Sequence, residues 1–402
     1  MLQLREYETR TVSLTDGQRA ELAALTRAAL ARAESPKVIQ SLTPSTMPGW
    51  FDIQPGPYVG RFTLPCGLTM DIGSRFSFAD LLEVLRVAAR QPALLRPTPA
   101  PARGGHGLIE LIATAFVREV ERIVGFGLAK GYQVRMFTRP PYPGVPDATA
   151  HLARYLGRPD CLVTRARRLT SDIPVNQALA AAHRVLRGQS YADPAIGVQL
   201  RALGPVFTQI TPVTDPLPVA QAAVRHAAAR YREAVALAVL VLAGQTTLPT
   251  ETGRAGASVL FNMTKVWEDY ARTWVRERLP AGHRLAVQHP IVLTDDESRM
   301  TANADLVEFD GSGHPTAVYD AKYKPWGETP SAGDLYQVIT YAHRLGINRA
   351  FLLYPGRGEH SEVIVGPLRI AMLGVQVLSA PPQPGAVRDA STQGVDTASL
   401  SW

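Results

Sequence analysis

The stretch Asn303–Lys324, NADLVEFDGSGHPTAVYDAKYK, decides the fold of the C-terminal third of the chain. Two runs rich in apolar residues flank Asp310–Gly313, DGSG, which is typical of a tight turn between neighbouring strands. We therefore expect strands over Met300–Phe309 and Thr316–Tyr323. Because the turn between them is tight, these two strands should pair antiparallel.

This hairpin would bring two carboxylates and a lysine to one edge of a sheet. Asp320 and Lys322 are two residues apart and share a strand face, and Asp305 on the neighbouring strand can reach the same place. Two close carboxylates repel each other, and a hard divalent cation such as Mg²⁺ relieves that repulsion. Such a cation polarises a phosphodiester and lowers the pKa of its bound water, which a neighbouring lysine can orient or deprotonate. The pattern therefore indicates metal-dependent phosphodiester hydrolysis.

Two flanking helices supply further candidates for the same site. The preceding helix, expected over Leu260–Leu279, carries Glu268, which could add a carboxylate to the metal site. The following helix, expected over Ala332–Leu345, carries Gln337 and Tyr341, which are four residues apart and therefore share a face. Any one of these residues alone is more often an ordinary surface or core residue, so the interpretation depends on their combination.

Composition limits the classes of function that remain. The chain has 402 residues, of which 46% are hydrophobic and 19% charged, so two or three domains with sizeable cores are expected. The formal net charge of +7 favours a polyanionic partner, nucleic acid above all, but only modestly. Arg165, Arg167 and Arg168 form a basic cluster that is either a DNA contact or a solvated face. Lys324 is similarly either a phosphate contact or a solvated lysine.

Several other classes of protein are excluded. Cys66 and Cys161 are too few for a disulfide framework, and no C-x-x-C or paired-histidine motif would hold zinc. The longest apolar run, Ala234–Gly244, is too short to cross a bilayer, and the first residues include acids and lack the apolar core of a secretory signal. We expect a cytoplasmic protein without a membrane partner.

The order of segments predicts a multidomain protein of the α+β and α/β classes. A Pro- and Gly-rich stretch, QPALLRPTPAPARGGHG, separates a strand-rich beginning from a helical middle, and the last residues are poor in core-forming side chains. The expected divisions are a strand-rich N-terminal domain over 1–90, a linker over 91–107, a mainly helical domain over 108–250, a core with a mixed sheet over 251–380 and a disordered tail over 381–402.

Local patterns predict the other elements of these domains. They are a hairpin over Gly60–Ile72; helices over Ser77–Ala89, Leu108–Gly127, from about Asn176, and over Leu217–Ala243; strands and loops over Tyr132–Ser171; and strands over Leu285–Leu293 and Arg349–Tyr354.

At this point the residues resemble a known family. Glu268, Asp305, the Asp320-Ala321-Lys322 triplet and Gln337-x-x-x-Tyr341 look like the motifs of the PD-(D/E)XK nuclease superfamily. The neighbouring sequence segments narrow the resemblance to McrC, the nuclease subunit of McrBC modification-dependent restriction systems, over about residues 60–355. These segments are MTKVWEDY (263–270), YDAKYK (319–324), DLYQ (334–337), TYA (340–342), GL-x-x-x-Y (127–132) and LTSDIPVN (169–176).

Two positions depart from the family pattern. Ala304 stands where the superfamily often has a proline before its first motif aspartate, a common exception. Gly73-Ser74-Arg75 stands where McrC proteins tend to show Pro-Lys, which affects the details of partner contact.

The resemblance implies a fold and a set of roles. The C-terminal domain would be a restriction-endonuclease-like PD-(D/E)XK core that binds Mg²⁺, with Mn²⁺ as a substitute. Asp305, Asp320, the Ala321 carbonyl and Glu268 would be the metal ligands. Lys322 would position the attacking water, and Gln337 would steady the site or the phosphate.

The resemblance also implies partners and an activity in restriction and antiviral defence. The chain would be a DNA endonuclease that acts on modified DNA together with a separate AAA+ GTPase of the McrB type, whose GTP hydrolysis it would stimulate. The N-terminal domain would face the motor, and paired nuclease domains would suit double-strand cleavage. The sequence contains no G-x-x-x-x-G-K-[ST] motif, in agreement with this division of labour. Two alternatives stay open: a non-enzymatic adaptor of an AAA+ motor, and a stand-alone DNA repair nuclease.

Overall fold

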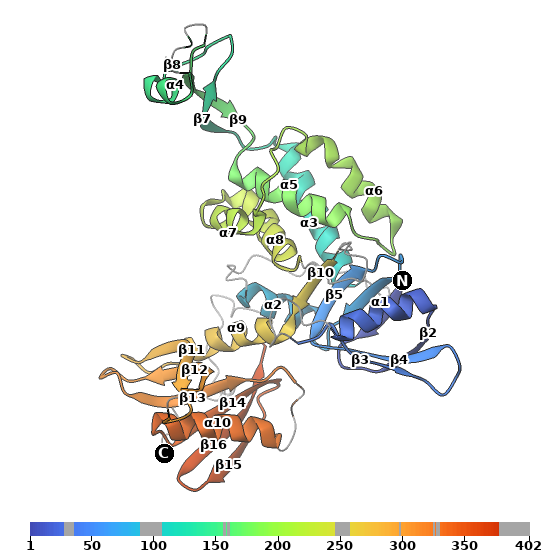
Figure 1. Ribbon diagram of the computed structural model, residues 1–402, viewed down its shortest axis with the longest axis vertical. Helices are drawn as coiled ribbons and strands as arrows, with labels where there is room; N and C mark the ends of the chain where they lie inside the picture. Colours follow the sequence, from blue (N-terminus) through green and yellow to red (C-terminus); the bar gives the residue numbers. More distant parts are fainter. Residues whose placement is uncertain are drawn as a thin grey trace, which may run out of the picture. The chain divides into compact units, whose positions relative to one another are not determined.

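The computed structural model describes residues 1–27, 36–88, 107–155, 158, 161–245, 258–296, 299–324, 326 and 330–377. The fold is mixed α/β with several sheets (Figure 1). The chain divides into two compact units: residues 1–102 with 248–256 and 260–402, and residues 103–247 with 257–259. The N-terminal strands and the predicted nuclease core thus belong to one unit. The predicted linker, apart from its last residue, and the predicted tail lie outside the described residues.

Two small sheets form the N-terminal part of the first unit, with strand orders β1-β6-β5-β10 and β2-β4-β3. The predicted hairpin is confirmed: β5 and β6 pair antiparallel, with Gly60 opposite Ile72. Inside it, Arg61 and Asp71 form a buried ion pair of 2.7 Å. The elements here are β1 (Leu2–Arg5), β2 (Arg10–Ser13), α1 (Asp16–Arg27), β3 (Ile39–Pro44), β4 (Trp50–Pro55), β5 (Tyr58–Thr63), β6 (Thr69–Gly73), α2 (Phe78–Ala88) and β10 (Ser258–Asn262).

A six-stranded mixed sheet in the order β11-β12-β13-β14-β16-β15 forms the C-terminal part of the same unit, as the sequence predicted for a mixed sheet. β13 pairs parallel with β14 and β14 with β16, while the remaining neighbours are antiparallel. The elements are α9 (Met263–Arg276), β11 (Arg284–Val292), β12 (Thr301–Phe309), β13 (Pro315–Ala321), α10 (Ala332–Leu345), β14 (Arg349–Gly356), β15 (His360–Val365) and β16 (Leu368–Gln376).

The predicted start of the helix before the hairpin is wrong. The helix expected from Leu260 begins instead at Met263, because Val259, Leu260 and Phe261 form strand β10. The side chain of Asn262 marks the change, since it accepts hydrogen bonds from the backbone of Thr264 and Lys265 at 3.1 and 3.3 Å. The short β-branched and aromatic run before this cap is buried in a sheet.

The second unit is a helical bundle that carries a small three-stranded sheet, β7-β9-β8. α8 is buried along nearly its whole length, from Ala234 to Leu242, and packs against α3, α5 and α7. The elements are α3 (Leu108–Gly125), β7 (Gly131–Phe137), β8 (Val145–Pro146), α4 (Ala148–Tyr155), β9 (Thr164–Thr170), α5 (Pro174–Arg187), α6 (Pro194–Ala202), η1 (Gly204–Phe207), α7 (Pro216–His226), η2 (Ala229–Tyr231) and α8 (Arg232–Ala243).

Two sequence predictions in this unit are corrected. The single helix expected over Leu217–Ala243 is two helices, because the backbone of Ala227 is extended and a short 3-10 turn precedes α8. The break lets the apolar α8 occupy the bundle interior with α7 packed on it. The segment expected to hold only strands and loops also contains α4, whose start is capped by Asp147 accepting from the backbone of Ala150 at 3.0 Å.

Candidate active site

The β12–β13 hairpin brings the predicted carboxylates together. The two strands pair antiparallel with Leu306 opposite Tyr319, which places Asp305 beside Asp320 and confirms the predicted pairing. One Asp305 oxygen, Oδ2, accepts a hydrogen bond of 3.0 Å from the backbone N–H of Ala321. The hairpin thus fixes the Asp305 carboxylate against the strand that carries the Asp-x-Lys triplet.

The strand expected to run to Tyr323 ends at Ala321, so Lys322 lies just beyond the end of β13, where the chain leaves the sheet, and not on the strand as predicted. Its Nζ is 2.6 Å from Asp320 Oδ2 and 4.0 Å from Asp334 Oδ1. Its backbone N–H donates to the carbonyl of Leu353 at 2.9 Å, and the indole of Trp267 donates to the same carbonyl at 3.0 Å. One carbonyl of β14 therefore holds both the backbone of Lys322 and the helix α9.

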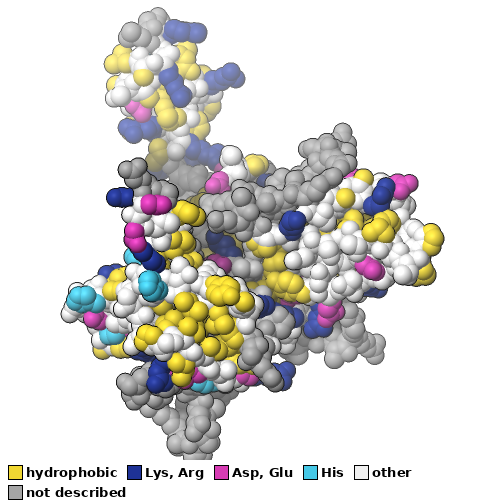
Figure 2. Space-filling model, turned by 60° about the horizontal axis from the view of Figure 1, so that its bottom comes forward, with side chains coloured by type: hydrophobic (Ala, Val, Ile, Leu, Met, Phe, Trp, Pro, Cys, Tyr) yellow, Lys and Arg dark blue, Asp and Glu magenta, His cyan; other side chains and the backbone are white. Residues whose placement is uncertain are grey.

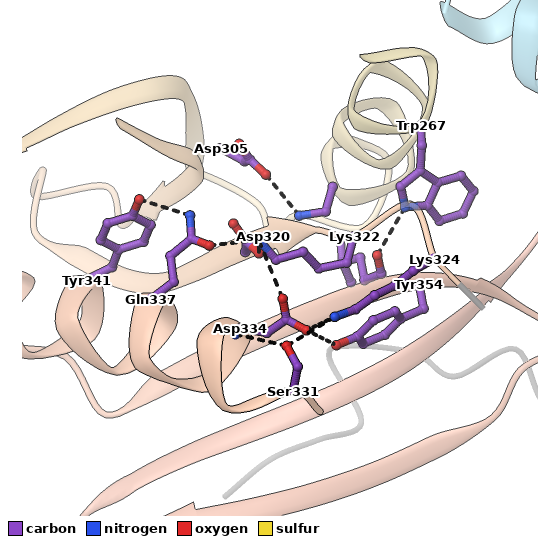
Figure 3. Close-up of polar contacts among 12 residues, drawn as sticks. Trp267, Asp305, Asp320, Lys322, Lys324, Ser331, Asp334, Gln337, Tyr341 and Tyr354 are labelled. Carbon is purple, nitrogen blue, oxygen red and sulfur yellow. Dashed lines mark hydrogen bonds and ion pairs between the residues drawn. The ribbon is translucent and has the colours of Figure 1, made fainter. Parts of the chain in front are cut away.

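Helix α10 continues the polar network, as the shared face of Gln337 and Tyr341 predicted (Figure 3). Lys322 Nζ donates to Gln337 Oε1 at 2.7 Å, and Gln337 Nε2 donates to the Tyr341 hydroxyl at 3.1 Å. The Tyr341 hydroxyl in turn donates to the carbonyl of Asn303 at 3.2 Å. The Tyr341 ring is buried in the core, so this residue both packs and anchors the network.

A cavity of about 640 Å³ opens beside this network. Helix α9 contributes Glu268, β12 contributes Asp305, and α10 contributes Gln337 and Tyr341 to its walls. Burial, followed by the charges of Asp305, Asp269 and Asp320, raises the pKa of Glu268 to about 7. A carboxyl with this pKa is readily ionised when a cation lies nearby.

Burial and neighbouring charges have competing effects on the pKa values of Asp320 and Lys322. The Asp320 side chain is only 1% exposed, and this burial, together with the charges of Asp305 and Asp334, raises its pKa despite the nearby Lys322. Burial alone would lower the pKa of Lys322, but the charges of Asp320, Asp334 and Asp305 outweigh burial and raise it. Lys322 is therefore a protonated donor, suited to orient a water or a phosphate oxygen rather than to act as a base.

Asp334 is a residue whose role the sequence reasoning missed. It lies in the first turn of α10, where its backbone N–H donates to Ser331 Oγ at 3.3 Å, and it accepts from the Tyr354 hydroxyl at 3.3 Å. It also pairs with Lys324, which donates to Ser331 Oγ at 3.2 Å. Lys324 therefore has structural partners rather than a freely solvated end. The Ser-x-x-Asp spacing at a helix start was the available signal.

The N-terminal part of the unit also contacts the end of the Asp-x-Lys segment. The Tyr323 hydroxyl donates to Glu6 at 2.7 Å, and the Tyr7 hydroxyl donates to the Tyr323 carbonyl at 3.3 Å. The guanidinium of Arg75 lies 4.0 Å from the centre of the Tyr323 ring. Arg75 belongs to the Gly-Ser-Arg sequence that departs from the family pattern, and here it stacks on the residue next to Lys322.

The donor set is chemically suited to a hard divalent cation. Carboxylates are the ligands that Mg²⁺ and Mn²⁺ prefer. Burial first, and then repulsion by neighbouring carboxylates, raises the pKa values of Glu268 and Asp320, and a bound cation would relieve that repulsion. Among the described residues, no three His, Cys, Asp or Glu side chains are already arranged around one point as metal ligands. Asp305 and Asp320 lie on adjacent strands, while Glu268 approaches the cavity from α9.

The predicted arginine cluster lies elsewhere, on strand β9 of the second unit. Arg167 stacks over the exposed ring of Tyr132 at 5.4 Å, and Arg168 lies 5.7 Å from the ring of Phe137, both on the paired strand β7. Figure 2 shows Lys and Arg side chains distributed among hydrophobic ones over the lobe that contains these strands. Among the helices that the structure describes, none is both long and apolar enough to span a bilayer.

Comparisons with known proteins relate the chain to a family and to solved structures. Residues 53–355 match the family described as McrBC 5-methylcytosine restriction system component. No curated protein sequence matches. A solved structure titled as a refined half-complex from a tetradecameric assembly of Thermococcus gammatolerans McrB AAA+ hexamers with bound McrC aligns with a TM-score of 0.61 and 15% identity, over 96% of this chain and 96% of that chain. The Thermococcus gammatolerans McrBC complex determined by cryo-EM aligns with a TM-score of 0.43 and 15% identity, over 69% of this chain and 88% of that chain.

Fold and site together define a mixed α/β protein in which two aspartates and a lysine meet beside a cavity lined by polar and charged side chains. The family match covers well over half of the chain and includes every candidate site residue. The chain belongs to the McrBC family of restriction system components, which confirms the family resemblance seen in the sequence.

Proposed function

We propose that this protein is the nuclease subunit of an McrBC-like restriction system, a metal-dependent endodeoxyribonuclease with a PD-(D/E)XK core. The observation that carries the proposal is the cluster of Asp305 and Asp320 on two adjacent strands with Lys322 just after the second, and Gln337 bonded to the lysine. A structural ion pair needs one carboxylate for its lysine, whereas this cluster adds Asp305 and Glu268 beside a cavity. Extra buried negative charge of this kind destabilises a fold and is typical of a functional site.

The residues would have separate roles in phosphodiester hydrolysis, metal binding for some and orientation of the water for another. Asp305, Asp320, Glu268 and the Ala321 carbonyl would hold Mg²⁺, or Mn²⁺ in its place, which supplies Lewis acidity toward the phosphodiester and acidifies a bound water. Lys322, protonated and held by Gln337, orients the attacking water and offsets negative charge that develops on the phosphate.

Gln337 holds Lys322 in place through a network anchored on the backbone. Its bond to Tyr341, and the bond from Tyr341 to the carbonyl of Asn303, fix the amide relative to strand β12. Gln337 therefore gives the Lys322 ammonium group a second, fixed partner besides Asp320.

We further propose that the protein acts with a separate AAA+ GTPase. The solved structure with a similar fold over 96% of this chain contains McrB AAA+ hexamers with bound McrC. The family description names 5-methylcytosine, which makes methylated DNA the first substrate to test. The motor would supply GTP hydrolysis and movement along DNA, and this chain would supply the cut.

The test is cleavage of methylated and unmethylated DNA with Mg²⁺, the AAA+ partner and GTP, with partner GTP hydrolysis measured in the same samples. We expect wild type to cut and Asp320→Ala to lose cutting while stimulation of GTP hydrolysis persists. Asp16→Ala is the matched control, because the Asp16 side chain is 99% exposed on α1. Stimulation without cutting by wild type would instead identify an adaptor, and cutting without partner or nucleotide would identify a stand-alone nuclease.

A further inference from the structure

Strand β11 contains an unusual backbone conformation directly opposite Asp305. Gln288 has a φ of 49°, in the left-handed region that residues other than glycine disfavour. The described non-glycine residues with positive φ are Tyr7, Gln288 and Arg299, and of these Gln288 alone lies within a strand. Such strain persists where the surrounding structure enforces it, and it concentrates at functional sites.

The ladder between β11 and β12 shows that the distortion is local. Val287 pairs with Leu306 and His289 pairs with Ala304, so the register is the same on both sides of Gln288. Gln288 and Asp305 face each other between these pairs without being a registered pair themselves. No residue is inserted, and the strand is bent at one position only.

The bend places the Gln288 amide on the Asp305 carboxylate. Gln288 Nε2 donates to Asp305 Oδ1 at 3.1 Å, while the backbone N–H of Ala321 donates to Oδ2 at 3.0 Å. The carboxylate is therefore held from both sides, by β11 and by β13. Gln288 also lines the cavity that Glu268 and Asp305 share.

We propose that Gln288 is a positioning residue that fixes the orientation of the Asp305 carboxylate for a divalent cation. The inference rests on the proposed function, because it assigns Asp305 to the metal site. An exposed glutamine with no ligand to prepare for would relax to an ordinary extended backbone, since leaving its amide in water has little cost. Side chains that orient metal ligands commonly contribute about tenfold or more to metal affinity.

The test is calorimetric titration of Mn²⁺ into the full chain, together with thermal unfolding without metal. Gln288→Gly removes the amide and suits the left-handed backbone, so we expect about tenfold weaker Mn²⁺ binding with an unchanged or higher Tm. Gln288→Asn keeps an amide on a shorter side chain and tolerates positive φ, so its affinity should lie between those of Gln288→Gly and wild type.

A matched control separates strain from positioning. Arg299 also has positive φ, at 41°, and does not line the cavity, so Arg299→Gly should leave Mn²⁺ affinity unchanged. Equal Mn²⁺ affinity in Gln288→Gly and wild type would overturn the inference, as would a fall in Tm that parallels the loss of affinity. If wild type itself bound no Mn²⁺, the proposed metal site would fail rather than the role of Gln288.

Discussion

Replacing Glu268 by glutamine should stabilise the metal-free protein at alkaline pH while it weakens metal binding. The pKa of Glu268 is raised to about 7 from 4.5, chiefly by burial and then by the charge of Asp305. A carboxyl whose pKa is raised by folding destabilises the fold when it ionises. The contribution of Glu268 to the free energy of unfolding is therefore most favourable below pH 4.5, falls as the pH rises and reaches its lower limit above pH 7.

The size of the effect follows from the same shift. At about 1.4 kcal/mol for each pKa unit, the full penalty is about 3 kcal/mol, and the partial exposure of Glu268 reduces it to about 1–2 kcal/mol. Glutamine keeps the shape of the side chain and cannot ionise. We therefore expect the free energy of unfolding of Glu268→Gln to be about 1–2 kcal/mol higher than that of wild type at pH 8 and to differ little from it at pH 5.

The assay is denaturant-induced unfolding with a chelator at both pH values, repeated with Mg²⁺. The matched control is Glu277→Gln, an exposed glutamate directly after the same helix, which should show no such gain. Added Mg²⁺ should stabilise wild type more than Glu268→Gln. A variant that is no more stable than wild type at pH 8, or that gains equally at pH 5, would refute the account of the carboxylate cluster.

Three other substitutions have defined outcomes. Lys322→Ala should abolish DNA cleavage in a gel assay without loss of partner GTPase stimulation, since it removes the donor to the water but leaves the fold. Asn176→Leu should lower the free energy of unfolding of its unit by about 2–4 kcal/mol in urea, because the fully buried Asn176 bonds the carbonyls of Ala129 and Ser171 and the hydroxyl of Tyr231. Asp71→Ala should cost about 3–5 kcal/mol by the same measurement, since it breaks a buried ion pair.

The site was largely predictable because its signals are local. A turn of four residues between two short apolar runs fixes which strands pair, and the pairing then places Asp305 beside Asp320. The spacing of Gln337 and Tyr341 fixes their common helix face in the same way. These inferences need only the period of a strand or a helix.

The features that were missed depend on contacts far apart in the sequence. Glu6 and Tyr323 are 317 residues apart, and no local pattern relates them. The left-handed backbone of Gln288 occurs in a strand opposite β12, and a glutamine gives no sign of positive φ in the sequence. The break between α7 and α8 occurs in an alanine-rich sequence that favours helix throughout, so only the packing of the bundle explains it.

The contact between the N-terminal strands and the Asp-x-Lys segment changes the view of how the protein is organised. Arg75 and Glu6 both hold Tyr323, the residue that follows Lys322. A part of the chain predicted to face the motor therefore also contacts the candidate active site.

The most direct test of the central claim is to locate a metal ion by anomalous diffraction from crystals soaked in Mn²⁺. The account predicts a peak at about 2.0–2.3 Å from carboxylate oxygens of both Asp305 and Asp320, which is lost in Asp320→Ala. Crystals that show no manganese at these carboxylates under saturating conditions, or an unchanged peak in the variant, would contradict the account.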